Sequence, residues 1–338
     1  MEIKRNISLK KYNTFGIDIQ AKYFAVFSSS DCLAEILNSS FGINHSSLIL
    51  GGGSNILFTK NYDGLVLKNE IDGIKKINED DAYIYVKAGA GVLWHTLVMY
   101  CIEHNLAGVE NLALIPGNAG AAPMQNIGAY GVEIKDVFHS LEAYHLQEKV
   151  MQTFTLADCA FGYRESVFKH QYKNQFAICS ITLRLNKKPV YNTSYGAIEQ
   201  ELEKAGVQQL NSKAIADAVI KIRSSKLPNP AEIGNAGSFF KNPEVEKTVY
   251  EKLKNEYPTI VGYHLQNNKV KLAAGWLIEQ CGWKGYRRGD AGCHAKQALV
   301  LVNYGNATGN EVYNLSEEIL QSVKEKFSVT LEREVNVV

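Results

Sequence analysis

The sequence lacks the cysteine and histidine spacing of a metal site. Its six cysteines and eight histidines are scattered, without a Cys-x-x-Cys or His-Glu-x-x-His motif. We therefore expect no structural or catalytic metal. In a chain of 338 residues, such cysteines are typical of reduced cytosolic thiols and not of a disulfide framework.

An excess of charge of one sign is also missing, since the formal net charge is +1. Proteins that bind nucleic acids or membrane surfaces usually carry a basic excess, so we expect neither partner. The first residues are charged and form no apolar signal core. The longest charge-free run, residues 111–132, contains prolines, glycines and amides and would make a poor membrane helix. These features favour a cytoplasmic protein.

The length favours two or three domains, because a single core rarely grows beyond roughly 250–300 residues. Hydrophobic periodicity predicts mixed strands and helices after an irregular segment at 1–20. The predicted strands are 21–27, 47–50, 64–68, 83–88, 137–146, 150–155, 176–185, 298–302 and 328–337, and the predicted helices are 30–37, 92–105, 212–223, 244–256, 271–281 and 309–327.

Two glycine-rich turns follow predicted strands. The turn Gly51-Gly-Gly-Ser-Asn55 is consistent with backbone amides that bind phosphate, or with a tight hairpin. The turn Gly89-Ala-Gly91 leads into a predicted helix, but Trp94 occupies the place of the third glycine in a dinucleotide fingerprint. No strand ending in an acidic ribose-binding residue follows at the expected distance. We interpret the second turn as a helix entry packed against a sheet.

Residues 115–131 form an uncharged loop with four glycines and two prolines. Glycine permits close approach of a ligand to the backbone, and proline interrupts regular structure. Asn118, Gln125 and Asn126 add neutral hydrogen-bonding groups. The loop suits a large, flat, polyphosphorylated ligand, although a buried turn between two sheets explains the composition equally well.

Three polar residues stand in contexts that leave their roles open. Arg164 lies between aromatic residues, where an arginine often only packs its stem on a ring. Glu334 lies on the polar face of the last predicted strand, where most glutamates are solvated. Ser238 lies between small residues and Phe239-Phe240, without the Gly-x-Ser-x-Gly motif of a hydrolase.

Eight stretches in order, spanning nearly the whole chain, resemble the UDP-N-acetylenolpyruvoylglucosamine reductase family, the flavoenzymes of peptidoglycan precursor synthesis. They are Tyr12-Asn-Thr-Phe15, Gly51-Gly-Gly-Ser-Asn55, Ala88-Gly-Ala-Gly91 with Trp94, residues 115–131, Gly162-Tyr-Arg-Glu-Ser166, Lys226-Leu-Pro-Asn-Pro230, Gly237-Ser-Phe-Phe-Lys-Asn-Pro243 and Leu331-Glu-Arg-Glu-Val335.

The resemblance implies a three-domain α+β fold. Residues 1–68 with 328–338, and residues 69–222, would form two parts of an FAD-binding unit of the vanillyl-alcohol-oxidase type. Residues 223–327 would form a C-terminal substrate-binding domain. A loop near 192–203 that carries Tyr195 would close over the substrate, and the last strand would return Glu334 to the active site.

The same resemblance implies non-covalent FAD, with NADPH as co-substrate. The implied FAD contacts are Asn13, Thr14, Gly51, Gly52, Gly53, Ser54, Asn55, Ile115, Pro116, Gly117, Gly120, Ala121, Gln125, Asn126, Gly128, Ala129 and Tyr130. The implied substrate contacts are Tyr163, Tyr195, Lys226, Asn242 and Gln297.

The reaction implied is reduction of UDP-N-acetylglucosamine enolpyruvate to UDP-N-acetylmuramate, with hydride from flavin N5 to C3 and a proton from Ser238 to C2. Arg164 would hold the substrate carboxylate through its planar fork. Glu334 would polarise the same carboxylate if it is protonated, which requires a pKa raised by burial. The implied partner is this small molecule alone, and we expect a monomer.

Two alternatives remain open. Another FAD-linked oxidoreductase of the same fold often holds its flavin through histidine or cysteine, and neither occurs in 51–55 or 115–131. A flavin- or nucleotide-sugar-binding protein without catalysis would not need Arg164, Ser238 and Glu334 together.

Overall fold

The structure, a computed structural model, describes residues 2–338. Its contacts divide the chain into two units. Unit 1 comprises Met1–Ile7, Ala21–Gly52 and Tyr62–Ser225, and unit 2 comprises Ser8–Gln20, Gly53–Asn61 and Lys226–Val338. The chain therefore passes repeatedly between the two units.

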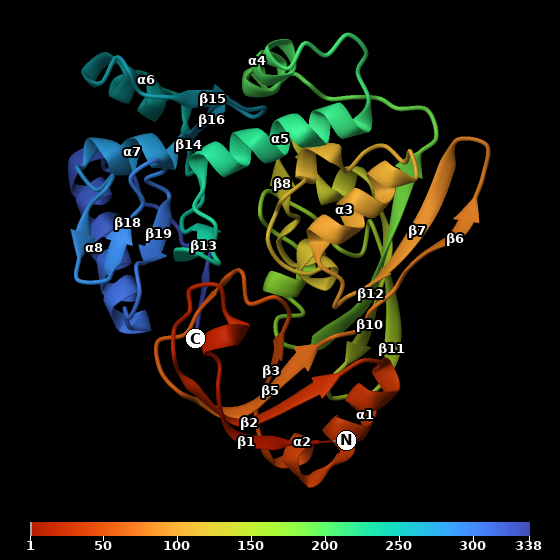
Figure 1. Cartoon of the computed structure of the whole chain (residues 1–338). Coiled ribbons are helices and arrows are strands. Elements are labelled where there is room, and N and C mark those ends of the chain that lie inside the picture. Colours follow the sequence, from red (N-terminus) through yellow and green to blue (C-terminus); the bar gives the residue numbers. More distant parts are fainter. Residues whose placement is uncertain (1) are drawn as a thin grey trace. The chain divides into compact units, whose positions relative to one another are not determined.

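A five-stranded antiparallel sheet is the centre of unit 1 (Figure 1). Its strands, in spatial order, are β11 (Met151–Thr155), β10 (Phe138–His145), β12 (Phe176–Asn186), β7 (Tyr83–Gly89) and β6 (Ile74–Glu79). The helices α3 (Trp94–Glu103), α4 (Gly196–Lys204) and α5 (Ser212–Lys226) contribute apolar side chains to the same core. Burying these apolar faces against the sheet is the main favourable term in forming this layer.

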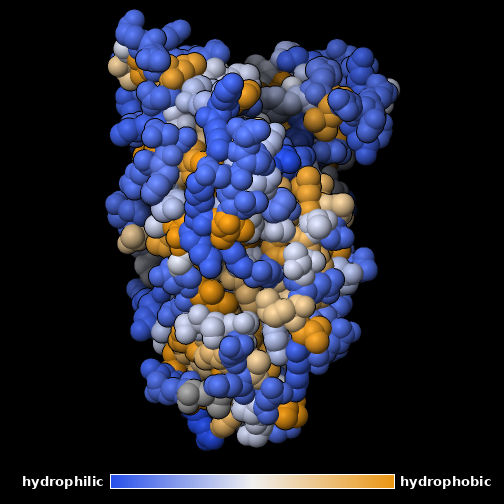
Figure 2. Space-filling model, turned by 90° about the vertical axis from the view of Figure 1, so that its right-hand side faces the viewer, coloured by the Kyte–Doolittle hydropathy of each residue, from blue (hydrophilic) through white to orange (hydrophobic). Residues whose placement is uncertain are grey.

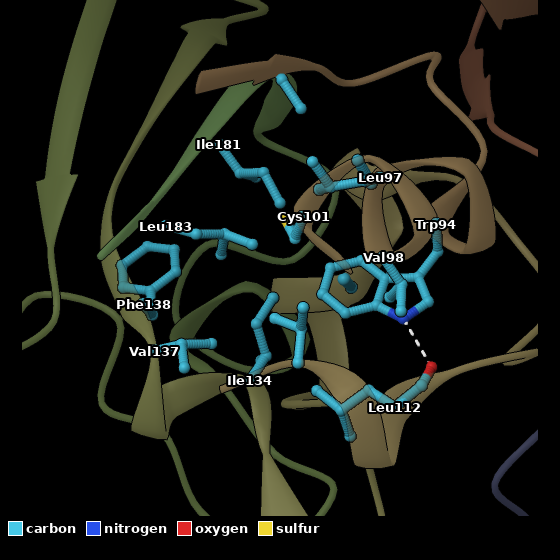
Figure 3. Packing of buried hydrophobic residues seen from close by; sticks show 14 of the residues in the cluster. Trp94, Leu97, Val98, Cys101, Leu112, Ile134, Val137, Phe138, Ile181 and Leu183 are labelled. Carbon is cyan, nitrogen blue, oxygen red and sulfur yellow. Dashed lines mark hydrogen bonds between the residues drawn. The ribbon is translucent and has the colours of Figure 1, made fainter. Parts of the chain in front are cut away.

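Trp94 is a core residue. Its side chain is 1% exposed and packs among Leu97, Val98 and Leu112 (Figure 3). The indole Nε1 donates a hydrogen bond to the Leu112 carbonyl at 2.9 Å, which satisfies its polar group. Trp94 therefore secures the start of α3 to the segment that leads into the 115–131 loop.

A second sheet of unit 1 has the order β1-β2-β5-β3, and β5 pairs in parallel with β2 and β3. The elements of this layer are β1 (Lys4–Ser8), β2 (Gln20–Phe27), β5 (Tyr62–Asn69), β3 (Ser47–Leu50), α1 (Ser30–Asn38) and α2 (Ser40–Asn44). Ser29 caps α1, since its hydroxyl accepts a bond from Cys32 N. Leu33, Ile36 and Leu37 of α1 pack with residues of both sheets.

Unit 2 is built from small sheets and three helices. One sheet has the order β13 (Gly234–Ser238), β19 (Val300–Asn303), β18 (Ala291–Cys293) and β17 (Arg287–Arg288), and the other has β14 (Glu244–Glu246), β16 (Lys269–Leu272) and β15 (Gly262–His264). The helices are α6 (Lys247–Glu256), α7 (Ala274–Gln280) and α8 (Gly309–Phe327). The predicted helix 309–327 is confirmed, and its Thr308–Glu311 capping box gives it a well-defined start.

The last two residues of the predicted final strand pair with the N-terminal part of the chain. β20 (Asn336–Val337) runs parallel to β4 (Ile56–Leu57). Upstream of β20, Val329, Leu331 and Val335 are buried, but they do not belong to a continuous strand. The prediction of a strand over 328–337 was therefore too long.

Three other element predictions were wrong in part. The segment 1–20 contains β1, and the predicted helices 244–256 and 271–281 begin with β14 and β16. The sequence Lys-Val-Lys-Leu of β16 alternates with period two, but so short a run is ambiguous in sequence. Pairing with neighbouring strands decides its conformation.

Candidate active site

The 115–131 loop is fixed to the start of α3 by backbone hydrogen bonds. Trp94 N donates to the Gly117 carbonyl at 2.9 Å, Ala119 N donates to the Val92 carbonyl at 2.7 Å, and Gly120 N donates to the Ala90 carbonyl at 3.0 Å. The loop contains a 3-10 helix, η3 (Ala119–Gln125), and the strand β8 (Gly128–Ala129), which forms a hairpin with β9 (Val132–Glu133) directly after the loop. The loop is thus a built extension of the core of unit 1.

The interpretation of Gly89-Ala-Gly91 as a packed helix entry is confirmed. A Cβ on Gly89 would overlap the Ile71 carbonyl oxygen, and a Cβ on Gly91 would lie 2.7 Å from Glu70 backbone carbon. Neither position has room for a side chain. The two glycines are therefore required because the segment 70–72, which follows β5, passes over them.

Gly51 and Gly52 lie against Asn118 of the loop. A Cβ on Gly52 would lie 2.6 Å from Asn118 Oδ1 and 3.2 Å from Gly117 Cα, whereas the nearest atom to a Cβ on Gly51 is 3.7 Å away. The Asn118 amide nitrogen donates to the Gly91 carbonyl at 2.6 Å. Its Oδ1 is buried and has no hydrogen-bond donor among residues 2–338, so it is an acceptor that a ligand hydroxyl or amino group can satisfy.

A cleft in unit 1 opens beside this contact. Its cavity volume is about 150 Å³, and it is partly open to solvent. Its lining combines backbone of Gly51 and Gly120 with the aromatic side chains of Phe168, Tyr172 and Phe176. Glycine backbone next to aromatic rings suits a ligand that is flat in one part and strongly hydrogen-bonding in another.

Arg164 lies against the hairpin of the 115–131 loop. Its Nη2 donates to the Gly128 carbonyl at 2.7 Å, and its guanidinium carbon lies 5.5 Å from the centre of the Tyr163 ring. The backbone of Arg164 has φ +56°, in the left-handed region that a bulky residue rarely adopts. The structure therefore brings predicted residues Arg164, Tyr163 and Gly128 together.

Arg223 is a neighbour of this group that the sequence did not single out, because it falls within a helix. Its Nε donates to the Leu114 carbonyl at 3.3 Å, and its guanidinium donates to the Tyr130 hydroxyl. Burial lowers the pKa of Arg223, and the nearby Arg164 lowers it further. Burial also raises the pKa of Tyr130. Two arginines therefore create a positive region at the ends of the loop, suited to an anion.

Ser238 ends strand β13 beside a bulge. The pairing of β13 with β19 shifts between Asn235 and Ser238, and Gly237 has φ +69°. The Asn235 Oδ1 accepts a bond from Gly237 N at 2.9 Å. A bulge redirects the following side chain, and the fully buried Phe239 and Phe240 hold the segment in place. Ser238 itself is only partly buried.

The segment that carries Glu334 pairs with the segment that follows Ser238 in unit 2. Glu334 N donates to the Phe239 carbonyl at 2.9 Å, and Lys241 N donates to the Glu332 carbonyl at 2.8 Å. The Asn55 amide donates to the Glu334 carbonyl at 3.2 Å. Two of the predicted catalytic residues thus come from segments that pair as neighbouring strands do.

The predicted substrate contacts Asn242 and Gln297 both lie near the start of α7 in unit 2. Asn242 Oδ1 accepts a bond from Ala274 N at the start of α7, at 2.9 Å. Gln297 Oε1 lies 3.1 Å from the position of a Cβ on Gly275. Lys226, at the end of α5, is exposed.

Two predicted FAD contacts have side chains that bond within the protein. The amide of Asn13 donates to the carbonyls of Leu9 and Ile17. The side chain of Asn126, which is fully buried, bonds to Glu133, Gly162 and Lys135. Thr14 N donates to the Gly53 carbonyl at 3.0 Å. These bonds hold the loops in shape, so the side chains of Asn13 and Asn126 have a structural role.

Several features of the cleft were missed in the sequence. Asn118 was noted only as a polar group of the loop, and the cleft-lining Phe168, Tyr172 and Phe176 were not assigned to any site. Their signal was the density of aromatic residues after Arg164.

Comparison with known proteins gives two matching family models. The FAD binding domain model matches residues 21–153, and the model of the UDP-N-acetylenolpyruvoylglucosamine reductase C-terminal domain matches residues 229–338. The UDP-N-acetylenolpyruvoylglucosamine reductase of Amoebophilus asiaticus is 52% identical and that of Flavobacterium johnsoniae 50% identical, each over all of both chains. The chain belongs to the UDP-N-acetylenolpyruvoylglucosamine reductase family.

Membership of this family makes the protein an FAD-dependent oxidoreductase. A solved structure of the Thermus caldophilus reductase is 22% identical, covers 100% of this chain and 99% of its own, and superposes with a TM-score of 0.67. The predicted α+β fold, with an FAD-binding unit and a C-terminal reductase domain, is confirmed. The boundaries of the three predicted domains stay a prediction.

The residues of unit 1 fit FAD. The orphan Asn118 Oδ1, the close approach of Gly52 to Gly117 and the aromatic wall of the cleft provide an acceptor, exposed backbone and flat apolar contacts. Among residues 2–338 no group of His, Cys, Asp and Glu side chains is placed to hold a metal. In that same range no helix is long and apolar enough to cross a membrane, and hydrophilic residues predominate on the face in Figure 2.

Substitution of Gly52 is expected to damage both the fold of the loop and FAD binding. In Gly52→Ala the new methyl group would meet Asn118 Oδ1 at 2.6 Å, and overpacking of this kind costs about 1–3 kcal/mol. We expect a lower melting temperature of the apoprotein and a lower flavin content. Gly51→Ala, where contacts start at 3.7 Å, serves as a control and should leave the apoprotein melting temperature unchanged. Equal melting temperatures for the two variants would contradict the proposed contact.

Proposed function

We propose that this protein is the NADPH-dependent enzyme that reduces UDP-N-acetylglucosamine enolpyruvate to UDP-N-acetylmuramate in the cytoplasm. The observation that carries the proposal is the backbone hydrogen bond from Glu334 to Phe239, the residue after Ser238, in a chain that belongs to this reductase family. Bound FAD would supply hydride transfer, from NADPH to flavin N5 and then to C3 of the enolpyruvyl group.

Adding hydride to C3 places negative charge on C2, and the substrate carboxylate shares that charge. Arg164 would hold this carboxylate by two hydrogen bonds from its planar guanidinium. The second cation, Arg223, strengthens the positive potential around Arg164. Glu334 would donate a hydrogen bond to the carboxylate from a protonated carboxyl group.

The reaction is completed by a proton at C2, which Ser238 would donate. A hydroxyl is a weak acid, but transfer to a carbanion-like centre is favourable when the donor is already in place. The bulge at Gly237 supports this role, since it re-aims the Ser238 side chain relative to its strand. The proton lost by Ser238 must then be replaced from solvent or a neighbouring acid.

Tyr195 would close on the UDP end of the substrate, and Tyr163, Lys226, Asn242 and Gln297 would be further substrate contacts. Lys226 is the cation of this set, suited to the diphosphate. Tyr195 is 44% exposed, and it ends an irregular segment before α4. The predicted loop 192–203 is therefore irregular only up to Tyr195 and helical after it.

The test is the visible spectrum of the purified protein. We expect a flavin spectrum that is bleached by NADPH and recovers when UDP-N-acetylglucosamine enolpyruvate is added without oxygen. A colourless preparation that binds no added FAD would refute the proposal. Reoxidation by oxygen but not by the enolpyruvyl sugar would indicate a different FAD-linked oxidoreductase.

A further inference from the structure

A buried asparagine connects the 115–131 loop to the segment that carries Tyr195. Asn111 is 1% exposed and lies in the short 3-10 helix η2 (Glu110–Leu112). Its amide nitrogen donates one hydrogen bond to the Tyr130 carbonyl and one to the Asn192 carbonyl, each at 2.9 Å. Both amide hydrogens are therefore used, one on each segment.

The Tyr195 segment, residues 192–195, has further contacts with the end of the loop. Asn192 Nδ2 donates to the Gly131 carbonyl at 3.1 Å. Within the segment, Ser194 Oγ donates to Asn192 Oδ1 at 2.7 Å. The Tyr195 ring stands edge-on to the Tyr130 ring, with centroids 5.2 Å apart. The position of Tyr195 is thus tied to that of Tyr130 through Asn111 and Asn192.

We propose that Asn111 is a positioning residue that holds the base of the Tyr195 segment on the flavin-binding loop, so that Tyr195 is set in place for the UDP-sugar. This inference rests on the proposed function, in which Tyr195 contacts the substrate. Asn111 would act through Tyr195 and not by direct contact with substrate or cofactor.

The chemistry of the amide explains why asparagine is suited to this position. Two carbonyl oxygens require two donors from one small buried side chain, and the asparagine amide provides them. Aspartate has nearly the same shape but presents only acceptors when ionised. Asn111→Asp would therefore repel both carbonyls and release the Tyr195 segment from the loop.

We expect Asn111→Asp to weaken binding of the UDP-sugar by about tenfold or more. Flavin reduction by NADPH at saturation should change by less than about threefold, because that step does not need Tyr195 closed on the UDP group. Sugar binding is measured as the change in the flavin spectrum on titration, and flavin reduction is measured separately by stopped flow.

A double-mutant cycle with Tyr195→Ala tests the route of the effect. If Asn111 acts through Tyr195, Asn111→Asp should change sugar affinity by less than about threefold in the Tyr195→Ala background. Additive losses would overturn the inference. A wild-type protein that shows no sugar titration would instead refute the proposed function itself, so the two failures are distinguishable.

Asn303→Asp is the matched control for damage to the fold. Asn303 is 4% exposed and its amide donates to the Phe15 carbonyl at 2.9 Å, in unit 2. Asn303→Asp should lower the melting temperature and leave sugar affinity unchanged.

A second variant is available if Asn111→Asp does not fold. Asn192→Ala removes the bond to Gly131 from the partly exposed side, and it should show the same non-additivity with Tyr195→Ala. Unchanged sugar affinity in a folded Asn111→Asp would overturn the proposal.

Discussion

Ser238→Ala is expected to leave flavin reduction by NADPH unchanged and to slow reoxidation by the enolpyruvyl sugar by more than about 10³-fold. The alanine removes the group proposed to protonate C2, and general acid catalysis contributes about 10²–10⁴-fold to such steps. Hydride transfer to C3 would become unproductive, since the charge that develops on C2 would have no proton donor. The first half-reaction involves no proton transfer to the sugar.

The backbone at Ser238 should tolerate this change. Ser238 is partly buried, and Phe239 and Phe240 on its C-terminal side are fully packed, so a smaller side chain creates little disturbance. Stopped-flow absorbance of the flavin follows each half-reaction separately. Equal losses in both half-reactions would remove Ser238 from the donor role, and unchanged reoxidation would assign the proton to another group.

Arg164→Lys is expected to slow sugar-dependent reoxidation by about 10²-fold or more, and to affect reduction by NADPH much less. Lysine keeps the charge but cannot offer two parallel donors to a carboxylate. Removal of one well-placed donor to a developing anion typically costs about 10²–10³-fold. Lysine would also lose the bond that Arg164 Nη2 makes to the Gly128 carbonyl.

The matched control is Arg184→Lys in unit 1. Arg184 is on strand β12, and its guanidinium lies 4.6 Å from the centre of the Tyr83 ring on strand β7. Arg184→Lys should leave the rates of both half-reactions unchanged. Stopped-flow traces of Arg164→Lys with wild-type reoxidation rates would contradict the assignment of the carboxylate contact to Arg164.

Arg164 is one of twelve non-glycine residues with positive φ among residues 2–338. A left-handed backbone in a non-glycine residue costs of the order of 1–3 kcal/mol, and such residues gather at functional sites. At φ +56° a glycine would be the unstrained choice. An arginine kept there suggests that the position of its guanidinium is needed.

The family could be predicted because its characteristic residues carry local signals. The order of the glycine turns, the uncharged loop and the short motifs around Arg164, Ser238 and Glu334 sufficed to identify the family. The Gly89-Ala-Gly91 turn was interpreted correctly because the dinucleotide pattern lacked a glycine at Trp94. Helix 309–327 could be predicted because its cap and its hydrophobic periodicity agree.

Other features depend on residues that meet only in the folded chain. The sequence by itself determined the motifs and the long periodic elements, since these depend on neighbouring residues. Only the tertiary structure decided that Phe239 pairs with Glu334, that Arg223 lies beside Tyr130, and that Asn111 joins two segments. These contacts could not be predicted for one physical reason. Each joins residues that are distant in sequence, and the hydrogen bonding and burial between them leave no periodic pattern in either segment.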